Sequence, residues 1–172
     1  MHKNILKYLI LLSIMITSCS LDLKTKELAK SELKGKSIVL IDNIFNLTYV
    51  ENHAVAFGFL GNISRKLRLP LIFLVTISAA FAGFYMIWKM RDRQFRILLP
   101  LFVLLAGAFG NILDRAMNGY VTDFFDFHYT SQYSFPVFNV ADVLINIGII
   151  LILIQFKDFN RIIDNLFTRE AN

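Results

Sequence analysis

The sequence predicts a membrane protein built from four transmembrane helices, with a small β-rich segment between the first and the second. The first observation is composition: 56% of the 172 residues are hydrophobic and only 18% are charged, whereas about a quarter of a soluble domain is charged. The second is the mean hydropathy of +0.55, and the third is the presence of four apolar stretches. Together they indicate one domain whose main solvent is lipid.

The apolar stretches are candidates for membrane spans, because a helix needs about 20 residues to cross the hydrocarbon of a bilayer. The expected spans are residues 4–22, 70–89, 97–114 and 137–156. The first reaches this length only if the Lys7 side chain extends to the headgroups. The second ends on Trp88 and Lys89, an aromatic and a basic anchor typical of the interface. The third contains Gly107 and Gly110, where a neighbouring helix could approach closely.

The connector between the first two spans is expected to form a small sheet over about residues 35–68. Apolar and polar side chains alternate over residues 45–49, which predicts a half-buried strand. Residues 37–41 and 55–60 are further strand candidates. The polar segment 24–36 before them is compatible with an extension of the first helix.

Charge and cysteine content exclude several classes of function. The net charge is +5, but the basic residues are scattered between apolar stretches, so anionic lipid headgroups are the expected counter-charge and nucleic acid is not an expected partner. The single cysteine, Cys19, excludes an intramolecular disulfide. The three histidines lack helical ligand spacing, so no metal and no cofactor is expected.

The orientation in the membrane is not decided by charge. The connector between the second and third spans is basic and the one between the third and fourth is acidic, which favours cytoplasmic termini. Counted over all segments, however, each side of the membrane carries nine basic residues.

The first span also has the pattern of a lipoprotein signal peptide. Lys3 and Lys7 precede an apolar run that closes on Ile-Thr-Ser-Cys at residues 16–19. Processing there would leave a lipid-anchored protein that begins at Cys19. The three later apolar stretches argue against this interpretation, because surface lipoproteins do not usually cross the membrane repeatedly.

Polar residues gather at the ends of spans that would share one membrane face, where charges are costly and usually mark function. They are Asp22 and Lys26 after the first span, Asp114 and Arg115 ending the third, Asp123 in the next connector, and Asn139 and Asp142 in the fourth. Ordinary explanations exist for some of them, such as a helix-end ion pair or interfacial anchors. Asp142 is harder to explain in this way, because an acid within an apolar span requires a partner.

Two carboxylates held together beside lipid would suit peptide hydrolysis. Repulsion and desolvation make such a pair share one proton. The ionised member can then take a proton from water while the protonated member polarises the scissile carbonyl. No Ser-His-Asp set, Gly-x-Ser-x-Gly motif or phosphate-binding glycine loop is evident in the sequence. Asp123 and Asp126 are three residues apart, and periodicity alone does not choose between them.

Five segments resemble, in order, the motifs of the lipoprotein signal peptidase family, also called signal peptidase II. Residues 22–26 (Asp-Leu-Lys-Thr-Lys) resemble its Asp-x-x-Thr-Lys, and residues 52–58 (Asn-His-Ala-Val-Ala-Phe-Gly) its Asn-x-Gly-Ala-Ala-Phe segment. Residues 107–115 (Gly-Ala-Phe-Gly-Asn-Ile-Leu-Asp-Arg) resemble Gly-x-x-Gly-Asn-x-x-Asp-Arg. Residues 121–124 (Val-Thr-Asp-Phe) and 135–142 (Phe-Pro-Val-Phe-Asn-Val-Ala-Asp) resemble Val-x-Asp-Phe and Pro-x-Phe-Asn-x-Ala-Asp. The resemblance extends over nearly the whole chain.

The resemblance implies an aspartic endopeptidase of the bacterial inner membrane that cleaves diacylglyceryl-modified prolipoproteins before the lipidated cysteine, without a metal or cofactor. Residues 1–172 would form a single membrane peptidase domain, with cytoplasmic termini and with the active site and the β-rich cradle outside. Asp123 and Asp142 would be the catalytic pair. The residues expected to bind substrate or support the pair are Asn52, Asn111, Arg115, Asn139, Asp114, Asp22 and Lys26.

Some features depart from the family pattern. Ala54 stands where the family has glycine, which bears on how closely a substrate backbone can approach. The lysine-rich first connector and the cysteine-containing end of the first helix are also unusual. The alternative is a non-enzymatic multi-span membrane protein, such as a small proton-coupled transporter, in which Asp142 relays protons or pairs with Arg115. Membrane lipids are expected partners in either case.

Overall fold

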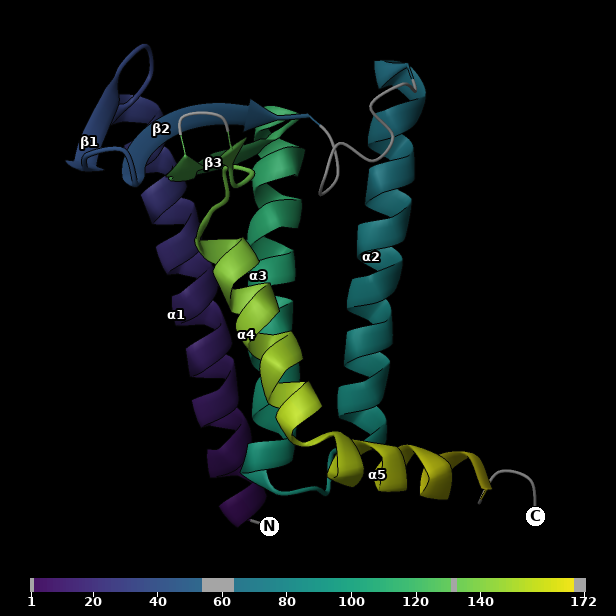
Figure 1. Cartoon of the computed structure of the whole chain (residues 1–172). Helices are drawn as coiled ribbons and strands as arrows, with labels where there is room; N and C mark the ends of the chain where they lie inside the picture. Colours follow the sequence, from purple (N-terminus) through teal and green to yellow (C-terminus); the bar gives the residue numbers. More distant parts are fainter. Residues whose placement is uncertain (1, 54–63, 131–132, 169–172) are drawn as a thin grey trace.

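The computed structural model describes residues 2–53, 64–130 and 133–168 and consists of five helices and four strands in these ranges (Figure 1). The helices are α1 (His2–Glu32), α2 (Arg65–Lys89), α3 (Phe95–Asn118), α4 (Val140–Ile154) and α5 (Phe156–Thr168). The strands are β1 (Ser37–Ile41), β2 (Phe45–Asn52), β3 (Val121–Thr130) and β4 (Tyr133–Ser134).

Three of the helices are long and apolar enough to cross a membrane, namely α1, α2 and α3. Each contains one of the first three expected spans. A fourth span is reached only if α4 and α5, which are bent by 75° at their junction, are counted as one broken span. Large apolar side chains such as Leu74 and Phe81 point away from the bundle, as expected where the surrounding solvent is lipid.

The helix α3 forms the centre of the bundle and packs against α1, α2 and α4. In the most apolar stretch of α3, 61% of the residues are buried. In the corresponding stretches of α1 and α2, 11% and 17% are buried. Small residues allow the close packing of α3 and α4, because a Cβ added at Gly107 would collide with the Ala141 carbonyl, and one at Gly148 would lie 3.0 Å from the Leu104 backbone. The expected role of Gly107 as a point of close helix approach is therefore confirmed.

The helix α1 is longer than its expected span and continues to Glu32, so Asp22 and Lys26 lie inside the helix and not at its end. Segment 24–36 is thus mostly helical, in agreement with the expected extension. Leu11, on the N-terminal half of α1, is fully buried in the core of the bundle. Cleavage before Cys19 would separate this packed half from the rest of α1.

The strands form a four-stranded antiparallel sheet in the order β1-β2-β3-β4 at the end of the bundle where α1 and α3 end (Figure 1). The strands expected at residues 37–41 and 45–49 are confirmed, and the second extends to Asn52. The strand expected at 55–60 lies outside the described residues. Confining the sheet to the first connector was wrong, because β3 and β4 come from the connector between α3 and α4.

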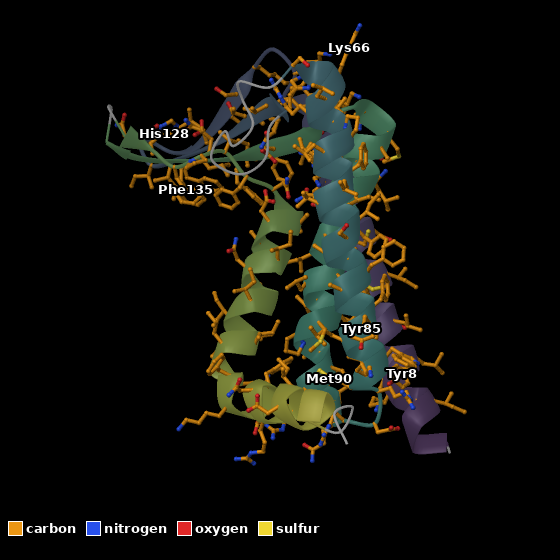
Figure 2. The ribbon with its side chains drawn as sticks, turned by 90° about the vertical axis from the view of Figure 1, so that its right-hand side faces the viewer. Tyr8, Lys66, Tyr85, Met90, His128 and Phe135 are labelled. Atoms are coloured by element: carbon orange, nitrogen blue, oxygen red, sulfur yellow. The ribbon has the colours of Figure 1, made fainter. Side chains whose placement is uncertain are left out.

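The fourth expected span, 137–156, is not one helix. Phe138 is extended and pairs with Phe125, and Asn139 caps the helix, so α4 begins only at Val140. After Gln155 the chain turns into α5, which the sequence analysis did not predict. Buried Phe159 and Ile162 pack this helix across the bundle end opposite the sheet (Figure 1). Figure 2 shows the two ends, with His128 and Phe135 at the sheet end and Tyr8 and Met90 at the opposite end.

Candidate active site

A cluster of buried polar side chains lies where the sheet meets the ends of α1, α3 and α4. Its almost fully buried members are Asp22, Lys26, Asp114, Arg115, Thr122, Asp123 and Asn139. Charges in such surroundings are stable only when they are paired and hydrogen-bonded. Arg115 interacts electrostatically with Asp114, Asp123 and Asp142. Hydrogen bonds and ion pairs join the other residues expected at the site, namely Asp22, Lys26, Asn52, Asn111, Asp114, Asp123, Asn139 and Asp142.

The first turn of α4 explains why Asp142 lies in an apolar span. Asn139 is the N-cap, and its side-chain oxygen accepts a hydrogen bond from the Asp142 N–H at 3.0 Å. In return, the Asp142 carboxylate accepts one from the Asn139 N–H at 3.1 Å. This reciprocal capping box satisfies N–H groups that would otherwise be unpaired at the start of the helix. It also places the Asp142 carboxylate at the positive end of the helix dipole.

Two side-chain amides join Asp142 to Asp123. The Asn111 amide donates to the other Asp142 oxygen at 2.9 Å. The Asn139 amide donates both to the Asn111 oxygen at 3.2 Å and to Asp123. The second Asp123 oxygen accepts from the Asn52 amide at 2.8 Å. The two carboxylates, from β3 and α4, are therefore held in one hydrogen-bonded network.

The environment of Asp123 stabilises its protonated form more than water does. The residue is 2% exposed, and burial together with the neighbouring Asp142 raises the pKa of its carboxyl from 3.8 to about 6, against the opposing effect of hydrogen bonds from Asn52 and Asn139 and of the Lys26 charge. Since the two acids interact, the proton belongs to the pair. Such a pair can supply an acid and a base at the same time.

The strand geometry separates Asp123 from Asp126, which periodicity alone did not distinguish. Side chains three residues apart on a strand point to opposite faces. The Asp126 carboxylate lies 3.1 Å from Nε2 of His128, two residues further on the same face, and His128 contacts the Asn46 amide at 3.2 Å. Asp126 thus belongs to a different group of side chains on the sheet.

A buried ion network supports the site from α1. Lys26 lies 2.7 Å from Asp22 and 3.9 Å from Asp114, and it donates to the Asn111 oxygen at 2.8 Å. Asp22 also accepts a hydrogen bond from the Ala141 N–H of α4 at 2.7 Å. A Cβ at Gly110 would collide with the Asp22 carboxylate. The expectation that Gly110 permits close approach is confirmed, with a buried carboxylate as its neighbour.

The sequence did not predict the contributions of Thr122 and Asn118 to the site. The Asp114 carboxylate accepts hydrogen bonds from the Thr122 N–H at 2.6 Å and from the Asn118 amide at 2.7 Å. These bonds tie the end of α3 to the start of β3, one residue before Asp123. The position of Asn118, one helical turn after Asp114, is a signal that could have indicated the second bond.

In the described ranges no three His, Cys, Asp or Glu side chains are grouped to hold a metal. Ala54, which departs from the family pattern, lies outside those ranges.

Comparison with known proteins gives consistent matches. A protein family described as "Signal peptidase (SPase) II" matches residues 14–157. The lipoprotein signal peptidase of Francisella tularensis subsp. novicida (strain U112) is 37% identical over 148 residues, 86% of this chain and 89% of the relative. The lipoprotein signal peptidase of Clostridium tetani (strain Massachusetts / E88) is 38% identical over 143 residues, which are 82% of this chain and 88% of that relative. A solved bacterial membrane enzyme structure at 1.9 Å superposes with a TM-score of 0.72 at 31% identity, covering 86% of this chain and 92% of that one.

The ion network predicts a large difference between two lysines on the same helix. Lys26→Met leaves the buried Asp22 carboxylate without its ion partner, and we expect the free energy of unfolding to fall by about 3–5 kcal/mol. Lys24→Met removes the ion pair with Glu27, in which the Lys24 side chain is 78% exposed and the Glu27 side chain 72% exposed. Here we expect the free energy of unfolding to change by about 0.5 kcal/mol or less. Denaturant unfolding in detergent micelles measures both. Equal losses in the two variants would show that Lys26 has no special structural role.

Proposed function

Because the chain belongs to the signal peptidase II family, we propose that it removes the signal peptides of bacterial prolipoproteins, cleaving before the diacylglyceryl-modified cysteine, with Asp123 and Asp142 as the catalytic pair. The observation that carries this assignment is the joining of the two carboxylates through Asn139 and Asn111, beside helices apolar enough to cross a membrane. The same family membership argues against the alternative of a non-enzymatic transporter.

The chemistry follows from one proton shared by two acids. Asp123, whose carboxyl has a pKa raised to about 6, donates its proton to the oxygen of the scissile carbonyl. Asp142 takes a proton from a water molecule, which attacks the carbonyl carbon and forms a tetrahedral diol. Asp142 then protonates the leaving nitrogen and Asp123 recovers the proton of the diol. The C–N bond breaks, and the pair returns to its starting protonation state.

The remaining site residues are proposed to hold the pair and the substrate. Asn111 and Asn139 already donate to the two carboxylates, so they orient the pair. Arg115 and Asn52 belong to the same network and are proposed to contact the substrate backbone. Asp22, Lys26 and Asp114 support these residues by fixing α1, α3 and α4 relative to one another.

We also propose the orientation of the protein in the bacterial inner membrane, with cytoplasmic termini and the sheet and active site on the outer face. The support is the basic turn between α2 and α3 and the acidic segment after α3. Alkaline phosphatase, which is active only outside the cytoplasm, should be inactive when fused after Asn172. High phosphatase activity of this fusion would reverse the orientation.

The catalytic assignment predicts which aspartates are essential. Asp123→Asn and Asp142→Asn preserve shape but remove a titrating group, so each should lower kcat by about a thousandfold or more. The double variant should be little worse, because residues that act as a unit are not additive. Asp126→Asn is the matched control on the same strand and should retain most activity, because Asp126 pairs with His128 away from the network.

These rates are to be measured with purified protein in detergent on a diacylglyceryl-modified precursor, with and without a chelator. The mechanism uses no metal, so activity should persist in chelator. An active Asp123→Asn enzyme beside an inactive Asp126→Asn enzyme would contradict the assignment, and inactivation by the chelator would contradict the mechanism.

The pKa of Asp123 predicts a pH dependence. The carboxyl loses its proton as the pH rises through about 6, and the pair then lacks its acid, so kcat/KM should fall on the alkaline side of this value. The hydrogen bond from Asn52 lowers the pKa of Asp123, so Asn52→Ala should move this alkaline limb to higher pH. A limb that stays in place in the variant would show that another group controls it.

A further inference from the structure

The end of the bundle opposite the active site carries an excess of positive charge. Basic residues at this end include Lys7, Lys89, Arg91, Arg93, Arg96, Lys157 and Arg161. Lys7 donates to the backbone carbonyls of Arg91 and Arg93, both at 2.9 Å, which joins the start of α1 to the turn between α2 and α3. The acids in the same segments are Asp92, Asp158 and Asp164. Asp158 pairs with Arg96 at 3.1 Å.

The helix α5 is held across this end and not along the bundle. Its axis is bent by 75° from that of α4. Phe159 and Ile162 are buried in the same core cluster as Met90 and Ile97, so one face of α5 is fixed against the ends of α2 and α3. If α4 crosses the bilayer, α5 lies close to the plane of the membrane surface, which is the arrangement of an amphipathic interfacial helix (Figure 1).

The exposed side of α5 has an open hollow of about 530 Å³, lined by Phe156, Lys157, Asn160, Arg161 and Asp164. Lys157 and Arg161 are four residues apart and therefore share one face of the helix. Neither forms an ion pair with an acidic side chain in the described ranges. Phe156 is 58% exposed, and Ile154 just before it is 75% exposed. Cationic and apolar surfaces therefore adjoin in one place.

We propose that this hollow binds the headgroup of an anionic phospholipid, with the phosphate against Lys157 and Arg161 and the upper acyl chains against Phe156 and Ile154. Each half of the lipid meets a surface of matching chemistry. Nucleic acid would match the two cations but not the apolar rim. Asp164 lines the same hollow and limits the net charge, which favours a singly charged headgroup over a highly charged polymer. The site lies at the opposite end from Asp123 and Asp142 and does not depend on the proposed peptidase function.

The test compares two lipids on the full-length protein. Purified protein in neutral detergent is incubated with equal amounts of phosphatidylglycerol and phosphatidylcholine of the same chain length, and bound lipids are counted by native mass spectrometry. The wild type should prefer phosphatidylglycerol. Lys157→Gln combined with Arg161→Gln should reduce this preference by about tenfold or more, the scale expected for two basic residues near an anionic surface.

The matched control is Lys34→Gln with Lys36→Gln, which removes the same charge from exposed positions at the sheet end and should keep the preference. Arg161→Lys should also keep it, because the charge remains. If the double variant does not fold, Arg161→Gln alone replaces it, with a smaller loss expected. Equal binding of both lipids by the wild type, or an unchanged preference in the variant, would overturn the proposal. Binding is read without any cleavage assay, so failure here is distinct from failure of the peptidase assignment.

Discussion

The buried ion pair between Asp22 and Lys26 is the interaction on which the rest of the site depends. Lys26 continues to Asn111 and Asp114 on α3, and Asp22 continues to the Ala141 N–H on α4. One pair of side chains on α1 therefore sets the position of two other helices. A buried ion pair is weak evidence of stability, because desolvation offsets most of the attraction. Its consequence here is register: only one axial position of α1 satisfies all of these partners.

The sheet supplies Asp123, the second acid of the proposed catalytic pair. Asp142 belongs to α4, but Asp123 belongs to β3, and β3 is positioned by its pairing with β2, where Val50 lies opposite Asp123 and Asn52 opposite Val121. The Asp114 carboxylate binds the Thr122 N–H and so fixes the start of the same strand to α3. The distance between the two acids thus follows from the packing of the bundle and from strand pairing together. A slip of one residue in β3 would turn Asp123 to the other face.

Only the family motifs indicated Asn52 and Asn111, and nothing in the sequence indicated Thr122. Hydropathy and local pattern predicted the apolar helices, the first two strands and the charged residues of the polar cluster. They did not predict β3, because phenylalanines at positions 124, 125 and 127 lie on both faces of the strand and hide the alternation. They placed the start of the fourth helix too early, because Phe138 is apolar but pairs with Phe125 in the sheet. They missed α5, although Phe156, Phe159 and Ile162 recur there at helical spacing. The pattern did not show that the chain bends after Gln155, because that bend depends on the packing of Phe159 and Ile162 against the ends of α2 and α3.

The two ends of the molecule use the same residue types in opposite ways. Lys26 is 2% exposed and its charge is satisfied by Asp22 and Asn111, so it can influence Asp123 through a medium with few water molecules, where electrostatic effects are strong. Lys157 is exposed on α5, where a charge is screened by water and salt over about 10 Å and can interact only with what approaches the surface. Burial therefore decides whether a charge in this chain takes part in chemistry or in contact with the membrane. This difference in burial is set by packing, which holds Lys26 against α3 and leaves Lys157 on the outer side of a helix that lies across the bundle end.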